Sequence, residues 1–432
     1  MNMKKVNIIS LGCSKNLIDT ELLLKQLDKA GYVTEKDMEN SDAEVVIINT
    51  CGFIGDAKEE SINTIFEQVE RKNEGLVKQI YVMGCLSQRY RYELKVELPE
   101  VDAFFGKFDW KGVLEKMGEH FDESIRNQRL LTTPSHYAYL KISEGCNRTC
   151  SYCAIPIITG KHKSRDFEEL LDECRQLVKG GVKEILVVAQ DLTYYGMDLY
   201  GKNRLAELIS RMADIEGLEW IRLHYAYPTG FPMELLTVMR ERTNVCKYLD
   251  IALQHCSDRM LKRMRRGITK QQTIDLIRRI RQEVPGIFIR TTLMCGHPGE
   301  TAEDFEELCQ FVQEMKFERL GIFSYSHEED TYCDENYKDD VPKNTKQERA
   351  ERIMELQAGI SQELNRPLIG QTLRVLIDRK EDDLYIGRTE YDSPEVDPEV
   401  LVNSDNELKI GEFYQVKITG SDEYDLYAIA CQ

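Results

Sequence analysis

Three cysteines in the middle of the sequence have a spacing that suits iron. Cys146, Cys150 and Cys153 follow the pattern C-x3-C-x2-C. Thiolates at this spacing can each bind one iron of a four-iron cluster, which leaves the fourth iron without a protein ligand. The amino and carboxylate groups of S-adenosylmethionine (SAM) can chelate that open iron and bring the sulfonium beside the cluster for one-electron cleavage, a chemistry that side chains alone do not supply. The spacing therefore predicts a radical enzyme with these cysteines at its catalytic centre.

Zinc is the alternative occupant of these thiols. Structural zinc sites use four ligands, usually two closely spaced pairs of cysteines or histidines. The sequence around Cys146 offers neither a second cysteine pair nor a nearby histidine pair. The aromatic residue Tyr152 before the last cysteine, and the position of the loop after a predicted strand, favour the iron cluster over zinc or free thiols.

A second set of cysteines is scattered through the first hundred residues. Cys13, Cys51 and Cys85 each stand beside a glycine, just after β-branched runs at 6–11, 44–49 and 79–83. Ligands of an open parallel sheet gather at the carboxyl ends of its strands, so these thiols are expected to converge on one edge. Single buried cysteines often pack as small apolar residues, which is the alternative. Three equivalent positions favour a second four-iron cluster, again with one open iron.

The other seven cysteines form no ligand pattern, and we predict that they are structural. They are Cys174, Cys246, Cys256, Cys295, Cys309, Cys333 and Cys431.

Polar residues that follow later predicted strands are candidates to hold SAM. In a β/α barrel such positions face the mouth at which ligands bind. The candidate segments are Gln190-Asp191, Gln254-His255 and Gly296-His297-Pro298-Gly299-Glu300. Arg165, which follows the run 160–164, is a further candidate, because arginine suits the recognition of carboxylates. The predicted cofactor contacts are Tyr152, Arg165, Gln190 and Gln254.

Each of these positions also has an ordinary interpretation. Glu300 can be a helix N-terminal charge, Gly299 a turn and His255 a surface residue. Arg165 can be a solvated loop arginine. For the basic run 262–266 we favour a solvated helix face over a contact with substrate.

The pattern of apolar residues predicts an α/β protein in which these positions lie at strand ends. The first part of the chain alternates short β-branched runs with helical stretches, as βα units on a parallel sheet do. Residues 126–135 predict a linker. A second series then predicts a partial (β/α)6 TIM-like barrel with its chemistry on the loops after the strands. Its strands are predicted at 137–143, 182–189, 219–225, 247–253, 287–294 and 318–324, with helices at 166–179, 204–215, 259–283 and 302–316.

The last part of the chain has a different pattern of predicted secondary structure. A polar helix at 344–365 leads to short strands at 372–378, 383–388, 400–402 and 413–420. This pattern predicts a small antiparallel β-barrel. Residues 366–432 hold 7 Lys and Arg against 15 Asp and Glu, a net charge of −8. The predicted domains are 1–125, 126–365 and 366–432.

Composition narrows the classes of protein that fit. A chain of 432 residues with 42% hydrophobic residues can bury a sizeable core. No apolar run is long enough for a membrane span and no signal peptide is evident, so we expect a cytoplasmic protein that binds no membrane. Thirteen cysteines are an odd number, which favours reduced thiols over a disulfide framework. A formal net charge of −18 disfavours a general nucleic-acid binder and suits a basic partner.

Three segments resemble the radical-SAM methylthiotransferases. They are 10–17 (SLGCSKNL), 136–146 (HYAYLKISEGC) and 387–397 (GRTEYDSPEVD). The resemblance covers essentially the whole chain, in the order methylthiotransferase domain, radical-SAM core and TRAM β-barrel. It is strongest to the branch that modifies a ribosomal protein, because tRNA-modifying relatives usually have Gln-Met-Asn where this chain has Ser14-Lys15-Asn16.

The resemblance implies a specific reaction. Cys13, Cys51 and Cys85 would hold an auxiliary cluster that carries the sulfur to be delivered, and the later three cysteines would hold the cluster that cleaves SAM. One SAM would donate a methyl group to that sulfur, and another would yield a 5′-deoxyadenosyl radical. The radical would remove hydrogen from the β-carbon of an aspartate in small-subunit ribosomal protein S-twelve, to which the methylthio group would be transferred. We also expect a monomer, reduced by a low-potential donor such as a flavodoxin or a ferredoxin.

The chemistry explains why two clusters are needed. An aspartate β-carbon has no leaving group and no readily lost proton, so acid-base and nucleophilic catalysis have little to act on. The two open irons must then share one site, and the N-terminal sheet edge is expected over the mouth of the barrel, where it excludes water.

Two other functions remain open from the sequence. A tRNA adenosine is the alternative substrate, which the acidic C-terminal barrel disfavours because it would repel phosphates. A non-catalytic iron-sulfur or zinc protein that binds RNA is the alternative class. It predicts tight RNA binding and no turnover of SAM.

Overall fold

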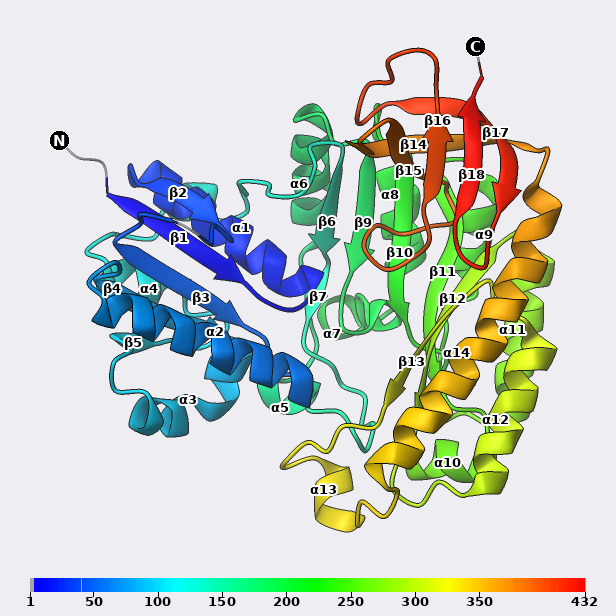
Figure 1. Cartoon of the computed structure of the whole chain (residues 1–432), viewed down its shortest axis with the longest axis horizontal. Helices are drawn as coiled ribbons and strands as arrows, with labels where there is room; N and C mark the ends of the chain where they lie inside the picture. The colour runs from blue at the N-terminus through cyan, green and yellow to red at the C-terminus, as the bar shows by residue number, and fades with distance from the viewer. Residues whose placement is uncertain (1–3, 40, 432) are drawn as a thin grey trace.

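The computed structural model describes residues 4–39 and 41–431, which form three regions (Figure 1). A parallel sheet with its helices, blue to cyan in the figure, lies beside a larger six-stranded sheet. A closed β-barrel, drawn in orange and red, packs over one end of the larger sheet. No helix in these residues is long and apolar enough to cross a bilayer.

The N-terminal sheet is parallel and has the strand order β2-β1-β3-β4-β5. The three central strands agree with the predicted runs, whereas β2 and β5 were not predicted. They are short edge strands, and the polar sequence of β2 (VTEK) shows no apolar alternation. The elements are β1 (Lys5–Ser10), α1 (Ser14–Lys29), β2 (Val33–Lys36), β3 (Val45–Thr50), α2 (Gly55–Asn73), β4 (Gln79–Gly84), α3 (Cys85–Glu97), β5 (Ala103–Phe104) and α4 (Trp110–Lys116).

The central region is the predicted partial barrel, with the parallel order β13-β12-β11-β10-β9-β6. Side chains alternate along each strand between helix-covered and inner faces. Along β10, Ile221 and Leu223 belong to the main apolar core, whereas Arg222 and His224 bond to the 389–397 segment on the other face. The strands are β6 (Tyr137–Lys141), β9 (Glu184–Val188), β10 (Trp220–Ala226), β11 (Val245–Gln254), β12 (Phe288–Cys295) and β13 (Arg319–Ser324).

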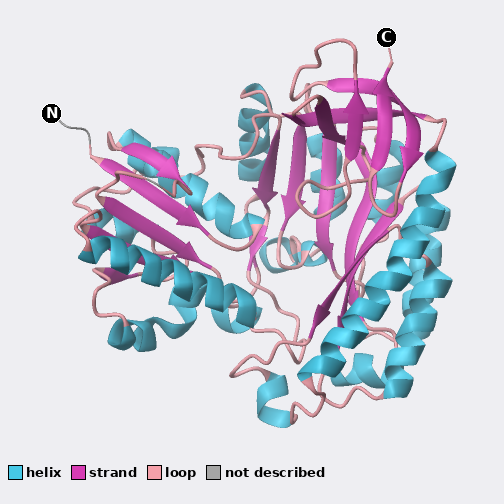
Figure 2. Cartoon of the chain, in the orientation of Figure 1, coloured by secondary structure: helices cyan, strands magenta, loops and turns pink. Residues whose placement is uncertain are grey.

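Helices cover the outer face of this sheet (Figure 2). The single helix predicted at 259–283 is wrong, because the structure divides it. Arg265 and Gly267 have φ of 59° and 66°, which ends the first part, and the capping box of Thr269 begins the second. The helices are α5 (Ile155–Thr159), α6 (Phe167–Lys179), α7 (Met197–Tyr200), α8 (Leu205–Ala213), α9 (Glu234–Glu241), α10 (Asp258–Arg263), α11 (Lys270–Glu283), α12 (Ala302–Met315), α13 (Tyr332–Asn336) and α14 (Lys343–Asn365). A small hairpin joins β7 (Ser143–Glu144) to β8 (Lys163–Ser164).

The C-terminal barrel is closed in the order β14-β15-β16-β18-β17. It packs against the starts of the central strands, where Leu376 and Phe413 meet Trp220 and Tyr248. One strand, β18, was not predicted, and its pairing with β16 is parallel, so the barrel is not antiparallel throughout. The strands are β14 (Thr372–Glu381), β15 (Leu384–Arg388), β16 (Val400–Asn403), β17 (Phe413–Ser421) and β18 (Leu426–Ala430).

Candidate active site

The loop that carries Cys146, Cys150 and Cys153 lies between β7 and α5, at the carboxyl end of the first barrel strand. The backbone N–H of Cys146 donates to the carbonyl of Gly160 at 3.1 Å. A Cβ on Gly145, whose φ is 74°, would lie 2.2 Å from the carbonyl oxygen of Lys161. The loop therefore needs glycine at this position in order to fold back on itself.

The three thiols of this loop lie close enough to influence one another. Burial raises the pKa of Cys146 to about 11, and the Cys150 thiol contributes. Burial also raises the pKa of Cys153, with Cys150 and Cys146 adding to the effect. Thiolates gathered in this way repel one another, so they need a positive group such as iron between them.

Donors are already directed at two of these sulfurs. The backbone N–H of Arg148 donates to Sγ of Cys146 at 3.4 Å, and the guanidinium of Arg266 donates to Sγ of Cys150 at 3.2 Å. Hydrogen bonds to the sulfurs stabilise thiolate ligands and tune the potential of an iron-sulfur cluster. The loop fits a cluster on these grounds.

Arg266 corrects the interpretation of the basic run 262–266. A solvated helix face is wrong for this residue, because its side chain is 3% exposed and also donates to the hydroxyl of Tyr152 at 3.2 Å. No local pattern in the sequence distinguishes Arg266 from the neighbouring arginines. Its position after the unexpected end of α10 turns it inward.

The structure also brings Cys13, Cys51 and Cys85 together. They follow β1, β3 and β4, which are adjacent in the sheet. A Cβ on Gly12 would lie 2.8 Å from Sγ of Cys51, so only glycine fits between the first two cysteines. Burial raises the pKa of Cys85 to about 12, and both other thiols of the set add to it.

Neither cysteine set has the arrangement of ligands around a single metal ion. In residues 4–39 and 41–431 no group of three or more His, Cys, Asp or Glu side chains is arranged to hold a single metal. A four-iron cluster spreads its cysteine ligands over separate irons, so their sulfurs need not converge on one point. The arrangement fits a cluster better than a zinc ion.

The two cysteine sets meet where the N-terminal sheet faces the barrel mouth. Cys85 packs against Ala154 and Ile158, which follow the last cysteine of the other loop. All three side chains are buried and belong to one apolar cluster. Helix α1 also packs on the inner face of the barrel, where Ile18 contacts Tyr139.

A buried ionic network lies between the two cysteine sets. Lys107 is 2% exposed and lies 3.4 Å from Glu144 and 4.0 Å from Asp19. Lys141 pairs with the same two carboxylates. The network joins the N-terminal sheet to the strand end that precedes Cys146.

The position of Lys107 in the site could have been predicted from the sequence. Lys107 follows the end of β5, so the strand-end rule would have included it had that strand been predicted. Lys15 is the second residue missed, and its ammonium lies 3.5 Å from the ring centroid of Tyr225. The Cys13 thiol is exposed, and the charge of Lys15 lowers its pKa below the ordinary value.

The predicted SAM contacts lie in different settings. Tyr152 precedes Cys153 and accepts from Arg266 at 3.2 Å. Gln190 donates to Glu144 at 2.9 Å, and its buried carbonyl oxygen has no partner within residues 4–39 and 41–431. Gln254 ends β11 with a φ of 72°. Arg165 pairs with Glu173 of α6 at 2.6 Å and donates to the Lys141 carbonyl, so a contact with SAM would require it to leave that pair.

The other strand-end residues make internal contacts. Asp191 accepts from Arg148 at 2.7 Å, and Glu300 pairs with Arg349 at 2.6 Å. The surface position considered for His255 is wrong, because the residue is fully buried and lies 3.6 Å from Glu300.

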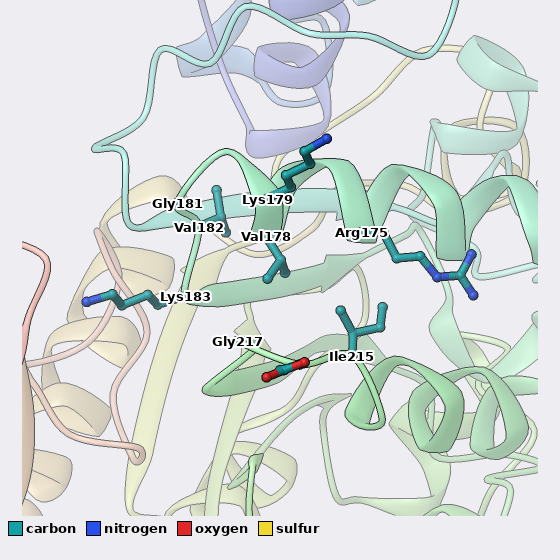
Figure 3. Close-up of a pocket in the computed structure, with 9 residues that line it drawn as sticks. Arg175, Val178, Lys179, Gly181, Val182, Lys183, Ile215 and Gly217 are labelled. Atoms are coloured by element: carbon teal, nitrogen blue, oxygen red, sulfur yellow. The ribbon is translucent and has the colours of Figure 1, made fainter.

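A surface hollow of about 400 Å³ lies far from this chemistry (Figure 3). It is formed by the end of α6, the segment before β9 and the segment before β10, with Arg175, Val178 and Gly217 among its lining residues. These are the starts of the strands, the opposite end from the cysteines. The hollow is therefore not part of the candidate site that the cysteine sets form.

Comparison with family models divides the chain into three matched segments. Residues 5–106 match the uncharacterized protein family UPF0004, residues 140–312 the radical SAM superfamily and residues 369–430 the TRAM domain.

Solved structures show the same fold at low identity. The radical SAM methyltransferase TsrM from Kitasatospora setae superposes with a TM-score of 0.53 at 13% identity, over 74% of this chain and 73% of that one. The cobalamin-dependent radical enzyme OxsB gives a TM-score of 0.52 at 14% identity, over 82% and 56% of the two chains.

Curated relatives match along the full length. A protein from Porphyromonas gingivalis is 61% identical over 430 residues, and one from Bacteroides thetaiotaomicron is 60% identical over 429 residues. The alignments cover 99% of this chain and 99% and 98% of the two relatives. Both relatives are named ribosomal protein uS12 methylthiotransferase RimO. The chain is thus a radical-SAM enzyme that uses a 4Fe-4S cluster and SAM, and it belongs to the RimO family of methylthiotransferases.

Proposed function

We propose that this protein transfers a methylthio group to the β-carbon of an aspartate in ribosomal protein uS12 (S-twelve), with SAM as methyl donor and radical source. The observation that carries the proposal is the full-length identity of 53–61% to relatives that bear this name. The packing of Cys85 against Ala154 and Ile158, which follow Cys153 in the sequence, supports it, because sulfur delivery and hydrogen removal must take place at one site.

Cys146, Cys150 and Cys153 would hold the cluster at which SAM binds. When bound, the cluster and SAM supply a carbon-centred radical that can remove hydrogen from an unactivated carbon. Arg266 and the Arg148 amide stabilise the thiolates through hydrogen bonds.

Cys13, Cys51 and Cys85 would hold the second cluster, which would present the sulfur. Support comes from their mutual proximity at one sheet edge and from the cation of Lys15 beside Cys13. A buried cation favours an anionic sulfur nearby.

The remaining residues of the site exclude water from the reaction. Ala154 and Ile158 pack against Cys85, and Ile18 closes the side of the barrel beside Tyr139. Exclusion of water limits side reactions of a radical intermediate.

We further propose the domain boundaries 1–125, 126–365 and 366–432, a monomeric cytoplasmic enzyme, and a flavodoxin or ferredoxin as its reductant. The matched family segments fall inside these boundaries. A tRNA substrate is disfavoured by the charge of −8 on residues 366–432, which would repel phosphates.

Mass spectrometry of uS12 tests the proposal. We expect a methylthio adduct on one aspartate in cells that carry the gene and none in cells that lack it. Identical masses in both would overturn the substrate. Anaerobic reconstitution, followed by an assay for 5′-deoxyadenosine, tests the radical chemistry separately, and a well-loaded protein that forms none would overturn it.

A further inference from the structure

The loop 389–397, between β15 and β16, leaves the C-terminal barrel and lies on the inner face of the six-stranded sheet. Asp392 accepts from Arg319 of β13 at 3.0 Å. Asp397 accepts from Arg290 of β12 at 3.2 Å. Both carboxylates are thereby neutralised by arginines of the barrel, which anchors the loop to two neighbouring strands.

Further contacts anchor the loop to the next two strands. Ser393 lies 3.1 Å from Nε2 of His224 on β10. Tyr248 of β11 donates to Asp397 at 2.7 Å. The guanidinium of Arg222 donates to the backbone carbonyls of residues 389 and 390. Four strands therefore hold this segment, which makes it part of the barrel interior.

Glu395 is the acidic residue of this loop that is not used as an anchor. In the sequence it lies midway between the anchors Ser393 and Asp397, and its side chain is exposed. Its φ is 70°, a conformation that costs a residue other than glycine about 1 kcal/mol or more. Among the described residues no lysine, arginine or histidine forms an ion pair with it, and its carboxylate accepts a hydrogen bond from the hydroxyl of Tyr139 at 3.3 Å.

Tyr139 connects this carboxylate to the cysteine end of the inner face. Burial raises the pKa of the Tyr139 hydroxyl, and the charge of Glu395 and the nearby Tyr225 add to it. Tyr225 has a φ of 64°, which breaks the strand alternation, and its ring carries the ammonium of Lys15 at 3.5 Å. The negative charge of Glu395 thus lies beside Tyr139, and the positive charge of Lys15 lies beside the nearby Tyr225.

Solvent reaches this part of the inner face. Tyr225 is 36% exposed, and Phe323, which points inward from β13, is 56% exposed. A segment of substrate can therefore contact these side chains without the core opening. An exposed carboxylate gains most from a cation when both are partly removed from water, as they are beside aromatic rings.

We infer that Glu395 is a specificity residue that binds a lysine or arginine side chain of the protein substrate, close to the residue that is modified. The inference rests on the proposed function, because it takes the substrate to be a protein. The loop is anchored to four strands and Glu395 is in a strained conformation. Its carboxylate, which forms no ion pair within the described part of the chain, lies beside Tyr139 on the face that leads to the cysteines. The positive charge of Lys15, beside Tyr225, suits the carboxylate of the substrate aspartate that is modified.

The test uses the full-length, anaerobically reconstituted enzyme and purified uS12, and it measures KM and kcat for methylthiolation. For Glu395→Gln we expect KM to rise about tenfold, which corresponds to about 1.4 kcal/mol, and the rise to shrink at high salt. Glu423→Gln is the matched control, because it removes one exposed charge from the same barrel, in the turn between β17 and β18 and outside the loop 389–397. Its KM is expected to stay within twofold of the wild type.

Two further measurements separate charge recognition from a structural effect. Tyr139→Phe removes the hydrogen bond but keeps the carboxylate, so a rise in KM as large as that of Glu395→Gln would overturn the inference. Glu395→Lys should be rescued by uS12 in which one lysine or arginine near the target is changed to glutamate, and no rescue at any such position would also overturn it.

Failure of the inference and failure of the proposed function give different results. If the wild-type enzyme modifies uS12 and Glu395→Gln and Glu423→Gln have equal KM values, the specificity role is wrong and the function stands. If the well-loaded wild type leaves uS12 unmodified, the proposed function is wrong, and the inference falls with it.

Discussion

Arg266 donates a hydrogen bond to the sulfur of Cys150 over 3.2 Å, although 116 positions separate them in the sequence. The guanidinium is buried, and it also contacts Tyr152 and the ring of Tyr227. A buried arginine directed at a thiol is favourable only where negative charge collects, as it does on the thiolate ligands of a cluster. This contact links the folding of the 264–268 turn to the chemistry of the cysteine loop.

Replacement of Arg266 by Met should weaken that cluster. Loss of the N–H···S bond is expected to lower the iron retained after reconstitution and to make the reduction potential more negative, because hydrogen bonds to sulfur stabilise the reduced cluster. Iron analysis and a redox titration followed by electron paramagnetic resonance measure both. Lys262→Met, an exposed charge of the same run, is the control. Equal iron and equal potentials in the two variants would contradict this role for Arg266.

The two cysteine sets should bind iron independently. Cys150→Ser and Cys85→Ser are each expected to retain about half of the wild-type iron, and the double variant close to none, because each set would hold one four-iron cluster. Iron and sulfide analysis of reconstituted protein checks this. Cys431→Ser, which changes an exposed cysteine, should keep the full amount. A full iron content in Cys85→Ser would rule out the second cluster.

Lys107→Met should destabilise the fold even before iron is considered. The substitution removes a buried cation that lies beside the carboxylates of Asp19 and Glu144. Removal of one partner from a buried ion pair costs about 3 kcal/mol. Urea unfolding of the metal-free chain measures the free energy. The control is Lys111→Met, whose pair with Glu123 is exposed and is expected to contribute less than about 1 kcal/mol.

The contact between the C-terminal barrel and the core should weaken in acid. Burial opposes ionisation of Asp378, but Arg388 at 2.6 Å and His136 lower the pKa of its carboxyl below 3.8. The folded state therefore holds the proton less tightly than the unfolded state, and the stabilisation is complete above the unfolded pKa. It is lost as pH falls from about 4 through the lower pKa of the folded protein.

Asp378→Asn tests this linkage. The variant should be less stable at neutral pH and should lose less stability than the wild type as the pH falls below about 4. Unfolding free energy measured against pH gives both slopes. Asp405→Asn, which changes an exposed carboxylate of the same barrel, should follow the wild-type curve. Parallel curves for Asp378→Asn and the wild type would exclude the proposed coupling.

Much of the fold could be predicted because most strands bury apolar runs that alternate with amphipathic helices. The central strands of the N-terminal sheet and all six barrel strands were found in this way. The short edge strands β2 and β5 were missed because too few of their residues carry a periodic signal. The last strand β18 was missed because its exposed residues, Tyr427 and Ile429, are apolar, so apolar and polar residues do not alternate along it. The division of the predicted helix 259–283 depends on two residues with positive φ, which apolar periodicity does not detect.

The sequence by itself determined which residues we propose as iron ligands, because the spacing of Cys146, Cys150 and Cys153 is local and the rule for parallel strands places Cys13, Cys51 and Cys85 at one edge.

Only the tertiary structure decided which charged residues belong to the site. Arg266 and Lys107 are buried beside cysteines, Arg165 is paired with a helix, and Glu395 reaches the barrel interior from another domain. In the sequence Arg165 is a candidate SAM contact, and nothing local distinguishes the other three from solvated charges. The partners of Arg266 and Glu395 are more than a hundred positions away in the sequence, and Lys107 and Arg165 bond to other elements of the fold. The burial of a charge is decided by such partners and not by its neighbours in the chain.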